Sequence, residues 1–156
     1  MISSRLYSDD ELNALRSMPK RVTNPGARWV EKPGHRQRNH QVTGGDQATR
    51  FAVYLRQNMQ DENDFSCGIA YLPLGGARLT LARYNGPSHI HREIAYRPHI
   101  HRATASAIAT GRKPESEADE TDRFATLEGA FGCLIDDFRL DGIARPETDQ
   151  PRLPAL

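Results

Sequence analysis

Residues 51–56 read FAVYLR, an alternation of apolar and more polar side chains that is typical of a half-buried β-strand. The stretches FSCGIAYL at 65–72 and LTLARY at 79–84 follow it along the chain and also favour strands. A turn rich in proline and glycine separates the second stretch from the third. The spacing therefore predicts consecutive antiparallel strands, with a fourth near residues 88–96.

Helical signals lie on both sides of these strands. Ser8 and Glu11 have the spacing of a capping box, which predicts an N-terminal helix that ends before Pro19. Residues 102–110 and 116–142 predict two helices after the sheet, the second with an apolar stripe at helical spacing. We therefore expect an α+β fold with an N-terminal helix, an antiparallel sheet of four or more strands, and C-terminal helices packed on one face.

The length of 156 residues predicts one domain. Its expected bounds are 1–142, including a basic segment at 20–49 whose proline and glycine pairs indicate mostly irregular structure. Residues 143–156 contain three prolines and are expected to form a tail.

Charge is distributed unevenly along the chain. Residues 16–56 carry nine Arg/Lys against two acids, whereas residues 115–141 carry nine Asp/Glu against two arginines, so the net charge of +1 hides a +7 and a −7 segment. The arginine-rich segment suits a phosphate-bearing partner, although the two segments could equally face each other. No stretch is typical of a signal peptide or a membrane span, so we expect a cytoplasmic protein without a membrane partner.

Histidines mark the expected functional site. Four of the six fall within thirteen residues as two His-x-His pairs, His89 with His91 and His99 with His101. Imidazole changes its charge near neutral pH, and in a strand the two members of each pair share a face. The cluster can move protons, bind a metal, or serve as a polar layer that holds a loop.

The leading interpretation is acid–base catalysis on a phosphodiester of RNA. RNA supplies its own 2′-hydroxyl nucleophile, so this chemistry needs no cofactor. The expected catalytic residues are His89, His91, His99, His101 and Tyr84. The expected phosphate-binding residues are Arg83, Arg92, Arg97, Arg102 and Asn85, because cationic groups and amides stabilise the charge that develops on phosphorus.

Two other interpretations stay open. Zinc or another divalent transition metal could be bound by His89, His91, Glu93, His99 and His101, since imidazole and carboxylate are typical ligands. Alternatively, the chain could be a non-enzymatic interaction module whose charge asymmetry recruits a protein partner.

The run from Arg83 through Asn85-Gly86 to the first histidine pair resembles small bacterial toxins of the TumE type. Those proteins are similar in having an Arg-Tyr-Asp/Asn turn, closely spaced histidines and a late helix in a compact α+β domain. Residues 77–101 carry the resemblance. It implies a toxin-like protein that works with a neighbouring antitoxin and acts on nucleic acid. Together with the histidine chemistry, we therefore expect a ribonuclease-like toxin or defence component with a cognate antitoxin.

Overall fold

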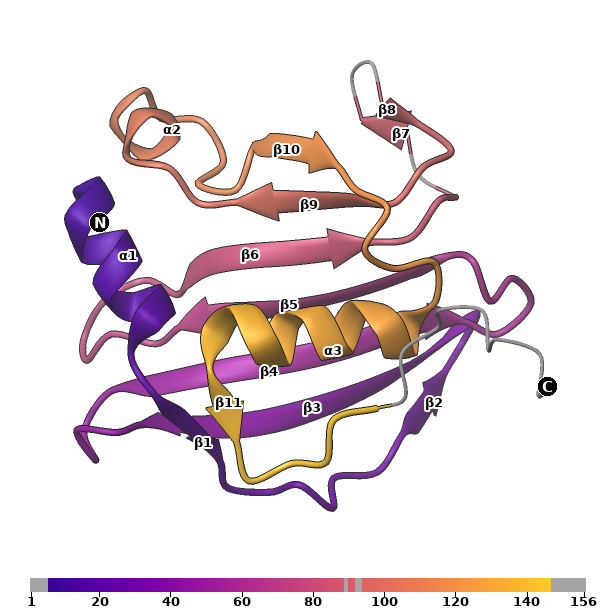
Figure 1. The fold of residues 1–156 in the computed structure, drawn as a ribbon, viewed down its shortest axis with the longest axis horizontal. Helices are drawn as coiled ribbons and strands as arrows, with labels where there is room; N and C mark the ends of the chain where they lie inside the picture. The colour runs from indigo at the N-terminus through magenta and orange to yellow at the C-terminus, as the bar shows by residue number, and fades with distance from the viewer. Residues whose placement is uncertain (1–5, 89, 92–93, 147–156) are drawn as a thin grey trace, which may run out of the picture.

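The computed structural model describes residues 6–88, 90–91 and 94–146, with only the backbone of 90–91 and 94–95. Its described part is dominated by a nine-stranded sheet that curls into a half-barrel (Figure 1). Across the sheet the strands are β10 (Glu117–Glu120), β9 (His99–Arg102), β6 (Leu79–Asn85), β5 (Phe65–Tyr71), β4 (Arg50–Asn58), β3 (His35–Gly44), β1 (Lys20–Val22) and β11 (Leu140–Asp141), with β2 (Val30–Lys32) paired to β3. A separate small sheet pairs β7 (Ile90–His91) with β8 (Ile94–Ala95).

The central strands follow the predicted alternation. Phe51, Val53 and Leu55 of β4 are buried, and this strand pairs antiparallel with both β3 and β5. The pairing of β5 with β6 is also antiparallel. The pairing of β1 with β11 is parallel, which makes the sheet mixed.

Helix α3 (Leu127–Phe138) packs on the concave side of the sheet (Figure 1). It begins at the N-cap Thr126, whose side chain accepts a hydrogen bond from the backbone N–H of Gly129. Its buried residues, among them Phe131, Leu134 and Phe138, join the inward side chains of the strands in one hydrophobic core. The opposite face of the sheet, called the outer face below, carries no long helix among the described residues.

Two shorter helices lie at one end of the half-barrel (Figure 1). Helix α1 (Asp9–Ser17) starts with the reciprocal hydrogen bonds of a capping box between Ser8 and Glu11. Helix α2 (Ala105–Ala109) is only five residues long.

The expected fold class is wrong in its architecture. The sheet is larger than predicted, curled and mixed, and one long helix rather than several packs against its face. Residues 117–120, expected as the acidic first turn of the last helix, form the edge strand β10, because they pair with β9.

The basic segment at 20–49 is also more ordered than predicted. It contains β1, β2 and the ten-residue strand β3, which pairs with β4 along its length. Most of β3 lacks apolar alternation, so only a short edge strand at Gln41-Val42 is predictable from its sequence. Strand β6 pairs with β9, not with the segment near 88–96.

None of the helices in the described part of the chain is both long and apolar enough to span a membrane.

Candidate functional site on the outer face of the sheet

The second histidine pair lies on the outer face of β9. Ile100 belongs to the hydrophobic core beneath α3, so its neighbours His99 and His101 point to the other side of the sheet. Their ring centroids are 5.0 Å apart at an interplanar angle of 64°. Both side chains are buried, with 0% and 2% of their surface exposed.

Backbone carbonyls set the tautomer of both rings. Nδ1 of His99 lies 3.0 Å from the carbonyl oxygen of Arg97, and Nδ1 of His101 lies 2.9 Å from that of Glu115. A carbonyl can only accept, so each Nδ1 carries a proton and donates it. In the neutral ring, each Nε2 then holds a lone pair that can take up a proton or bind a metal.

Strand β6 supplies two polar neighbours to this pair. Asn85 is opposite His99 and Arg83 is opposite His101 in the register of β6 and β9. Cross-strand partners share a face, so these two side chains are also on the outer face. The Asn85 amide nitrogen donates to Nε2 of His99 at 3.3 Å, which leaves His99 neutral in this arrangement.

Two buried polar atoms beside the histidines have no hydrogen-bond partner among the residues that the structure describes. They are Nε of Arg83 and Oδ1 of Asn85, and the Asn85 side chain is only 8% exposed. A buried polar group without a partner costs roughly 1–3 kcal/mol, so such atoms are rare unless a ligand or water binds them. Their place next to two imidazoles marks a site that can accept an anionic oxygen at Arg83.

The register continues this site into a stripe across the sheet. Starting from His99 and from His101, cross-strand pairing passes through β6, β5 and β4 to β3. We call these two rows the outer stripe; its members are Gln37, Arg56, Ser66, Asn85 and His99 in one row, and Asn39, Tyr54, Gly68, Arg83 and His101 in the other. The outer stripe is thus polar, with one aromatic ring and two arginines.

Tyr54 connects the two rows of the outer stripe. Its hydroxyl lies 2.9 Å from the Ser66 hydroxyl, and its ring lies over Gly68, where a Cβ would approach it to 2.7 Å. Burial raises the pKa of Tyr54 above its ordinary value of 10.0, while the Ser66 hydrogen bond and the Arg83 charge act to lower it. The phenol therefore stays protonated at neutral pH and can donate a hydrogen bond.

Glu115 lies close to the same groups. Its side chain is only 5% exposed, its carbonyl binds His101, and the charge of its carboxylate acts to raise the pKa of Tyr54. The segment before β10 therefore places a carboxylate near the histidine pair, Tyr54 and Arg83.

Further arginines extend the positive charge of the outer face. In the register, Arg21 of β1 is opposite Thr43, and Arg50 of β4 is opposite the same residue and donates to its hydroxyl at 3.0 Å. Arg21 lies 3.9 Å from Asp141, but both side chains are more than two-thirds exposed, so this ion pair is weak. Together with Arg56 and Arg83, these residues give the sheet surface a cationic character.

Tyr84 does not join the histidines. It lies between Arg83 and Asn85 on β6, so it points to the concave face, where its hydroxyl donates to Asp137 of α3 at 2.6 Å. Burial and the Asp137 carboxylate both raise the pKa of Tyr84. Its place in the structure is that of a core residue.

The other expected site residues are placed as follows. Arg97 is exposed and forms an ion pair with Glu120 at 2.8 Å, and Arg102 is exposed at the end of β9. His91 lies in β7, where the structure describes only the backbone. His89, Arg92 and Glu93 lie outside the described residues.

Within residues 6–88, 90–91 and 94–146, no group of three or more His, Cys, Asp or Glu could hold a metal ion. The described ligands of the metal interpretation are therefore His99 and His101 alone. The hydrogen bond from each Nδ1–H to a backbone carbonyl is nevertheless the arrangement that orients histidines in metal sites.

Sequence reasoning missed Ser66 and Glu115 as neighbours of the histidines. The alternation in β5 could have placed Ser66 on the polar face with the help of the strand register. Glu115 carries no such signal, because it precedes a short edge strand and reaches the site only through the pairing of β9 with β10.

Comparisons of this chain with protein-family models, with curated proteins and with solved structures give no match. A functional assignment therefore depends on the chemistry of the outer face.

Proposed function

We propose that the chain is a small ribonuclease-like protein that binds RNA along the outer stripe and cleaves it at the His99–His101 pair. The observation that carries this proposal is the adjacency of two Nδ1-protonated imidazoles to buried atoms of Arg83 and Asn85 that have no hydrogen-bond partner in the described part of the chain. Acid–base catalysis on a phosphodiester needs two proton carriers and a cationic contact to the phosphate.

The proposed step is an internal transfer within RNA. One neutral histidine takes the proton of the 2′-hydroxyl through Nε2 as the 2′-oxygen forms a bond to phosphorus. The bond from phosphorus to the 5′-oxygen breaks, and the second histidine, protonated at Nε2, gives its proton to that oxygen. The products are a 2′,3′-cyclic phosphate and a 5′-hydroxyl.

Asn85 suits a histidine that gains and loses a proton. Its amide nitrogen donates to neutral His99, and a half-turn of the amide would present Oδ1 as an acceptor to the protonated ring. One side chain can thus stabilise both protonation states.

The exposed and half-exposed members of the outer stripe would make the first contacts with RNA. Arg83 and Arg56 would bind phosphates, and Tyr54 offers an aromatic ring and a protonated hydroxyl. Because both histidines are buried, cleavage also requires an opening that exposes their Nε2 atoms while the Glu115 carbonyl keeps its hydrogen bond to His101.

The test compares a fluorescent single-stranded RNA with the same sequence in DNA, both with a chelator present. We expect cleavage of the RNA alone, with cyclic-phosphate ends, because DNA lacks the 2′-hydroxyl. Intact RNA, or equal cleavage of both strands, would overturn the proposal.

In the cell, we propose that this activity belongs to a cytoplasmic toxin or defence component restrained by a cognate antitoxin. The TumE-type resemblance over residues 77–101 supports this context. Toxicity on expression that disappears with a His99→Gln/His101→Gln double variant would support it, and equal toxicity of the variant would contradict it.

A second candidate function is metal binding. It is favoured by the burial of His99 and His101 and by their hydrogen bonds to carbonyls, which are common features of metal ligands. His89, His91 and Glu93 would complete the ligand set. Elemental analysis of untagged protein distinguishes the two candidates: near-stoichiometric zinc that is lost from the double variant would favour the metal site, and its absence would exclude it.

A further inference from the structure

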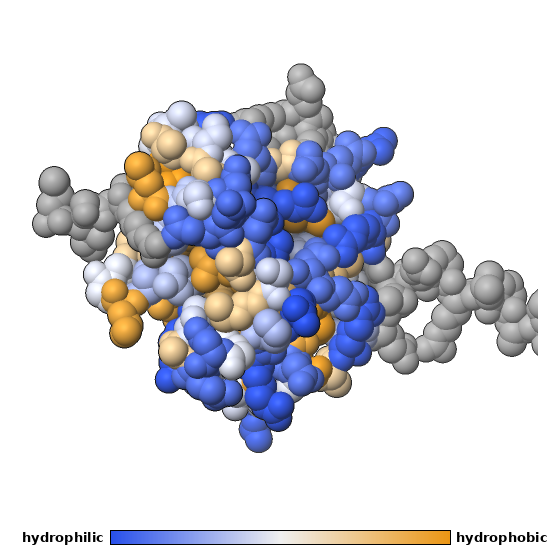
Figure 2. Space-filling model, turned by 60° about the vertical axis from the view of Figure 1, so that its left-hand side comes forward, coloured by the Kyte–Doolittle hydropathy of each residue, from blue (hydrophilic) through white to orange (hydrophobic). Residues whose placement is uncertain are grey.

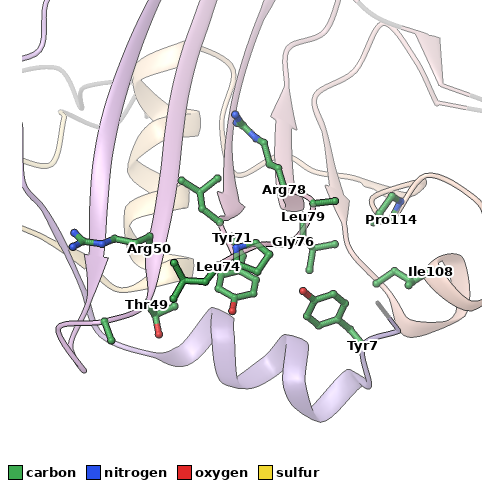
Figure 3. Close-up of a pocket in the computed structure, with 14 residues that line it drawn as sticks. Tyr7, Thr49, Arg50, Tyr71, Leu74, Gly76, Arg78, Leu79, Ile108 and Pro114 are labelled. Atoms are coloured by element: carbon green, nitrogen blue, oxygen red, sulfur yellow. The ribbon is translucent and has the colours of Figure 1, made fainter. Parts of the chain in front are cut away.

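A cavity of about 630 Å³ lies at the end of the half-barrel that carries α1 and α2. It opens between Tyr7, two residues before α1, the turn from β3 to β4, the turn from β5 to β6, and α2 (Figure 3). Its volume falls within the range of roughly 300–1,000 Å³ that is usual for small-molecule sites. None of its lining residues belongs to the outer stripe.

Aromatic and aliphatic side chains form the body of this cavity. Tyr7 and Tyr71 stand edge to face, with ring centroids 6.4 Å apart and an interplanar angle of 87° (Figure 3). The rings of Tyr71 and Phe51 also pack together, with centroids 6.0 Å apart, and this contact holds Tyr71 against the core. Across the cavity lie Ile108 and Pro114 (Figure 3). These walls are built before any ligand arrives, as in most small-molecule sites.

The β5–β6 turn adds exposed leucines to the rim. Leu74 is fully exposed and Leu72 is 37% exposed, and both line the cavity. Figure 2 turns this end of the molecule toward the reader and shows small apolar areas among mainly hydrophilic side chains. Covering these leucines would remove apolar surface from water, worth about 25 cal/mol per Å².

The charge of the lining is entirely positive. Arg50 and Arg78 are its charged members, both are exposed, and no acidic residue lines the cavity. Arg50 donates to the Thr43 hydroxyl, and in the described part of the chain neither arginine forms an ion pair with a carboxylate. In Figure 3 both guanidinium groups point away from Tyr7 and Tyr71, so either one would have to turn inward to meet an anionic group at the rim.

We propose that this cavity binds a small anionic amphiphile: a molecule with an aliphatic or aromatic body and one carboxylate or sulfonate group. The body would lie between Tyr7, Tyr71 and Ile108, and the anion would lie at the rim, where the side chain of Arg50 or Arg78 would turn toward it. The cavity is separate from the histidine pair, although Arg50 also belongs to the arginines of the outer face.

The test uses 8-anilinonaphthalene-1-sulfonate, an anionic aromatic probe that fluoresces in apolar surroundings, with the full chain. We expect saturable binding that decanoate displaces and decanol, which lacks the charge, displaces much less. Arg50→Ala and Arg78→Ala should each weaken probe binding by roughly fivefold, as expected for exposed charges. Arg112→Ala, whose side chain pairs with Glu117 at the sheet edge, is the matched control and should bind like the wild type.

Filling the cavity provides the second arm of the test. Ala77 and Ala48 are exposed lining residues on two different turns, so Ala77→Trp and Ala48→Trp each place a large ring in the cavity without disturbing the core. We expect both variants to melt like the wild type and to lose the probe. Unchanged probe binding in a folded filled variant, equal displacement by decanol, or absence of saturable binding would overturn the proposal.

Discussion

Lys20 illustrates how single residues hold this fold together. Its side chain is 2% exposed, and its Nζ donates to the carbonyls of Arg16 and Met18 at the end of α1 and of Phe138 at the end of α3. It also lies 4.9 Å from the centre of the Phe51 ring. Burial, together with the charges of Arg139 and Arg16, lowers the pKa of Lys20 from its ordinary value of 10.5 to about 7, so the amine is only partly protonated at neutral pH. Its hydrogen bonds satisfy the ends of two helices that are far apart in sequence.

We expect Lys20→Met to lower the free energy of unfolding by about 3 kcal/mol, because three carbonyls lose their donor. Lys32→Met, on the exposed strand β2, is the control and should change stability by less than about 0.5 kcal/mol. Urea denaturation measures both, and equal stability of the two variants would show that the Lys20 contacts contribute little.

His40 is a buried histidine on the concave face. It stacks on Phe131 with a centroid distance of 6.0 Å, and its Nδ1–H donates to the carbonyl of Asn24 at 3.1 Å. Burial lowers the pKa of His40 below its ordinary value of 6.5, and the charge of Arg38 acts in the same direction. The ring is therefore neutral in the folded protein.

This pKa predicts a loss of stability in acid. As pH falls through 6.5, the ring of the unfolded chain takes up a proton and the folded one does not, so the free energy of unfolding decreases. The difference in urea midpoint between about pH 7.5 and about pH 5 should be smaller in His40→Phe than in the wild type. A variant with the same acid loss as the wild type would contradict a neutral His40; His35→Phe controls for loss of a histidine on β3.

At the scale of elements, Gly68 shows how two strands approach each other in the outer stripe. A Cβ at this position would lie 2.8 Å from the backbone oxygen of Ala82 and 2.7 Å from the Tyr54 ring. The backbone oxygen belongs to β6, the strand that carries Arg83 and Asn85. The spacing of the candidate site thus depends on a glycine in the middle of β5.

Gly68→Ala should therefore destabilise the protein by about 1–3 kcal/mol, the usual cost of overpacking, although alanine itself is tolerated in strands. Gly26→Ala is a matched control, since a Cβ there meets no atom within 4 Å. Thermal unfolding of both variants checks this prediction, and a neutral Gly68→Ala would show that β6 can shift.

How far the sequence predicts the elements depends on burial. Strands β4, β5 and β6 bury one face under α3, so their polarity alternates and their positions are predictable. Most positions of β3 are polar. Even on its concave side the residues Arg38 and His40 are polar, so apolar and polar residues do not alternate regularly along this strand. Strand β10 is an acidic edge strand, which resembles the acidic start of a helix in sequence.

The same limit applies to the candidate site. Alternation places His99 and His101 on one face of a strand, as in the structure. The same alternation points Tyr84 to the opposite face from Arg83 and Asn85. Tyr84 therefore should not have been predicted as a catalytic residue beside them. The neighbours from β4 and β5 required the register of the whole sheet, which local pattern does not determine.

At the scale of the whole molecule, the half-barrel divides the chain into two chemical surfaces. The concave side holds α3 and the hydrophobic core, whereas the outer face carries the histidine pair and arginines from β1, β4 and β6. Arginines on an open sheet surface suit a phosphate backbone, and binding to it weakens with salt through release of counterions.

RNA binding should therefore be salt-dependent, and the outer-face arginines should contribute to it. We expect Arg56→Ala and Arg83→Ala each to reduce the slope of log affinity against log salt by roughly 0.7, the value for one phosphate contact on a single strand. Arg112→Ala at the β10 edge should leave the slope unchanged. Fluorescence anisotropy measures these slopes. An unchanged slope in both outer-face variants would show that RNA does not bind to this face.

The most direct measurement is the single-turnover rate of RNA cleavage, with chelator, for the wild type, His99→Gln, His101→Gln and the control His35→Gln. We predict a loss of at least about 100-fold in each of the first two variants, the contribution of a proton carrier, and no change in the control. Cleavage at the wild-type rate by either variant of the pair would contradict the assignment of that histidine to catalysis.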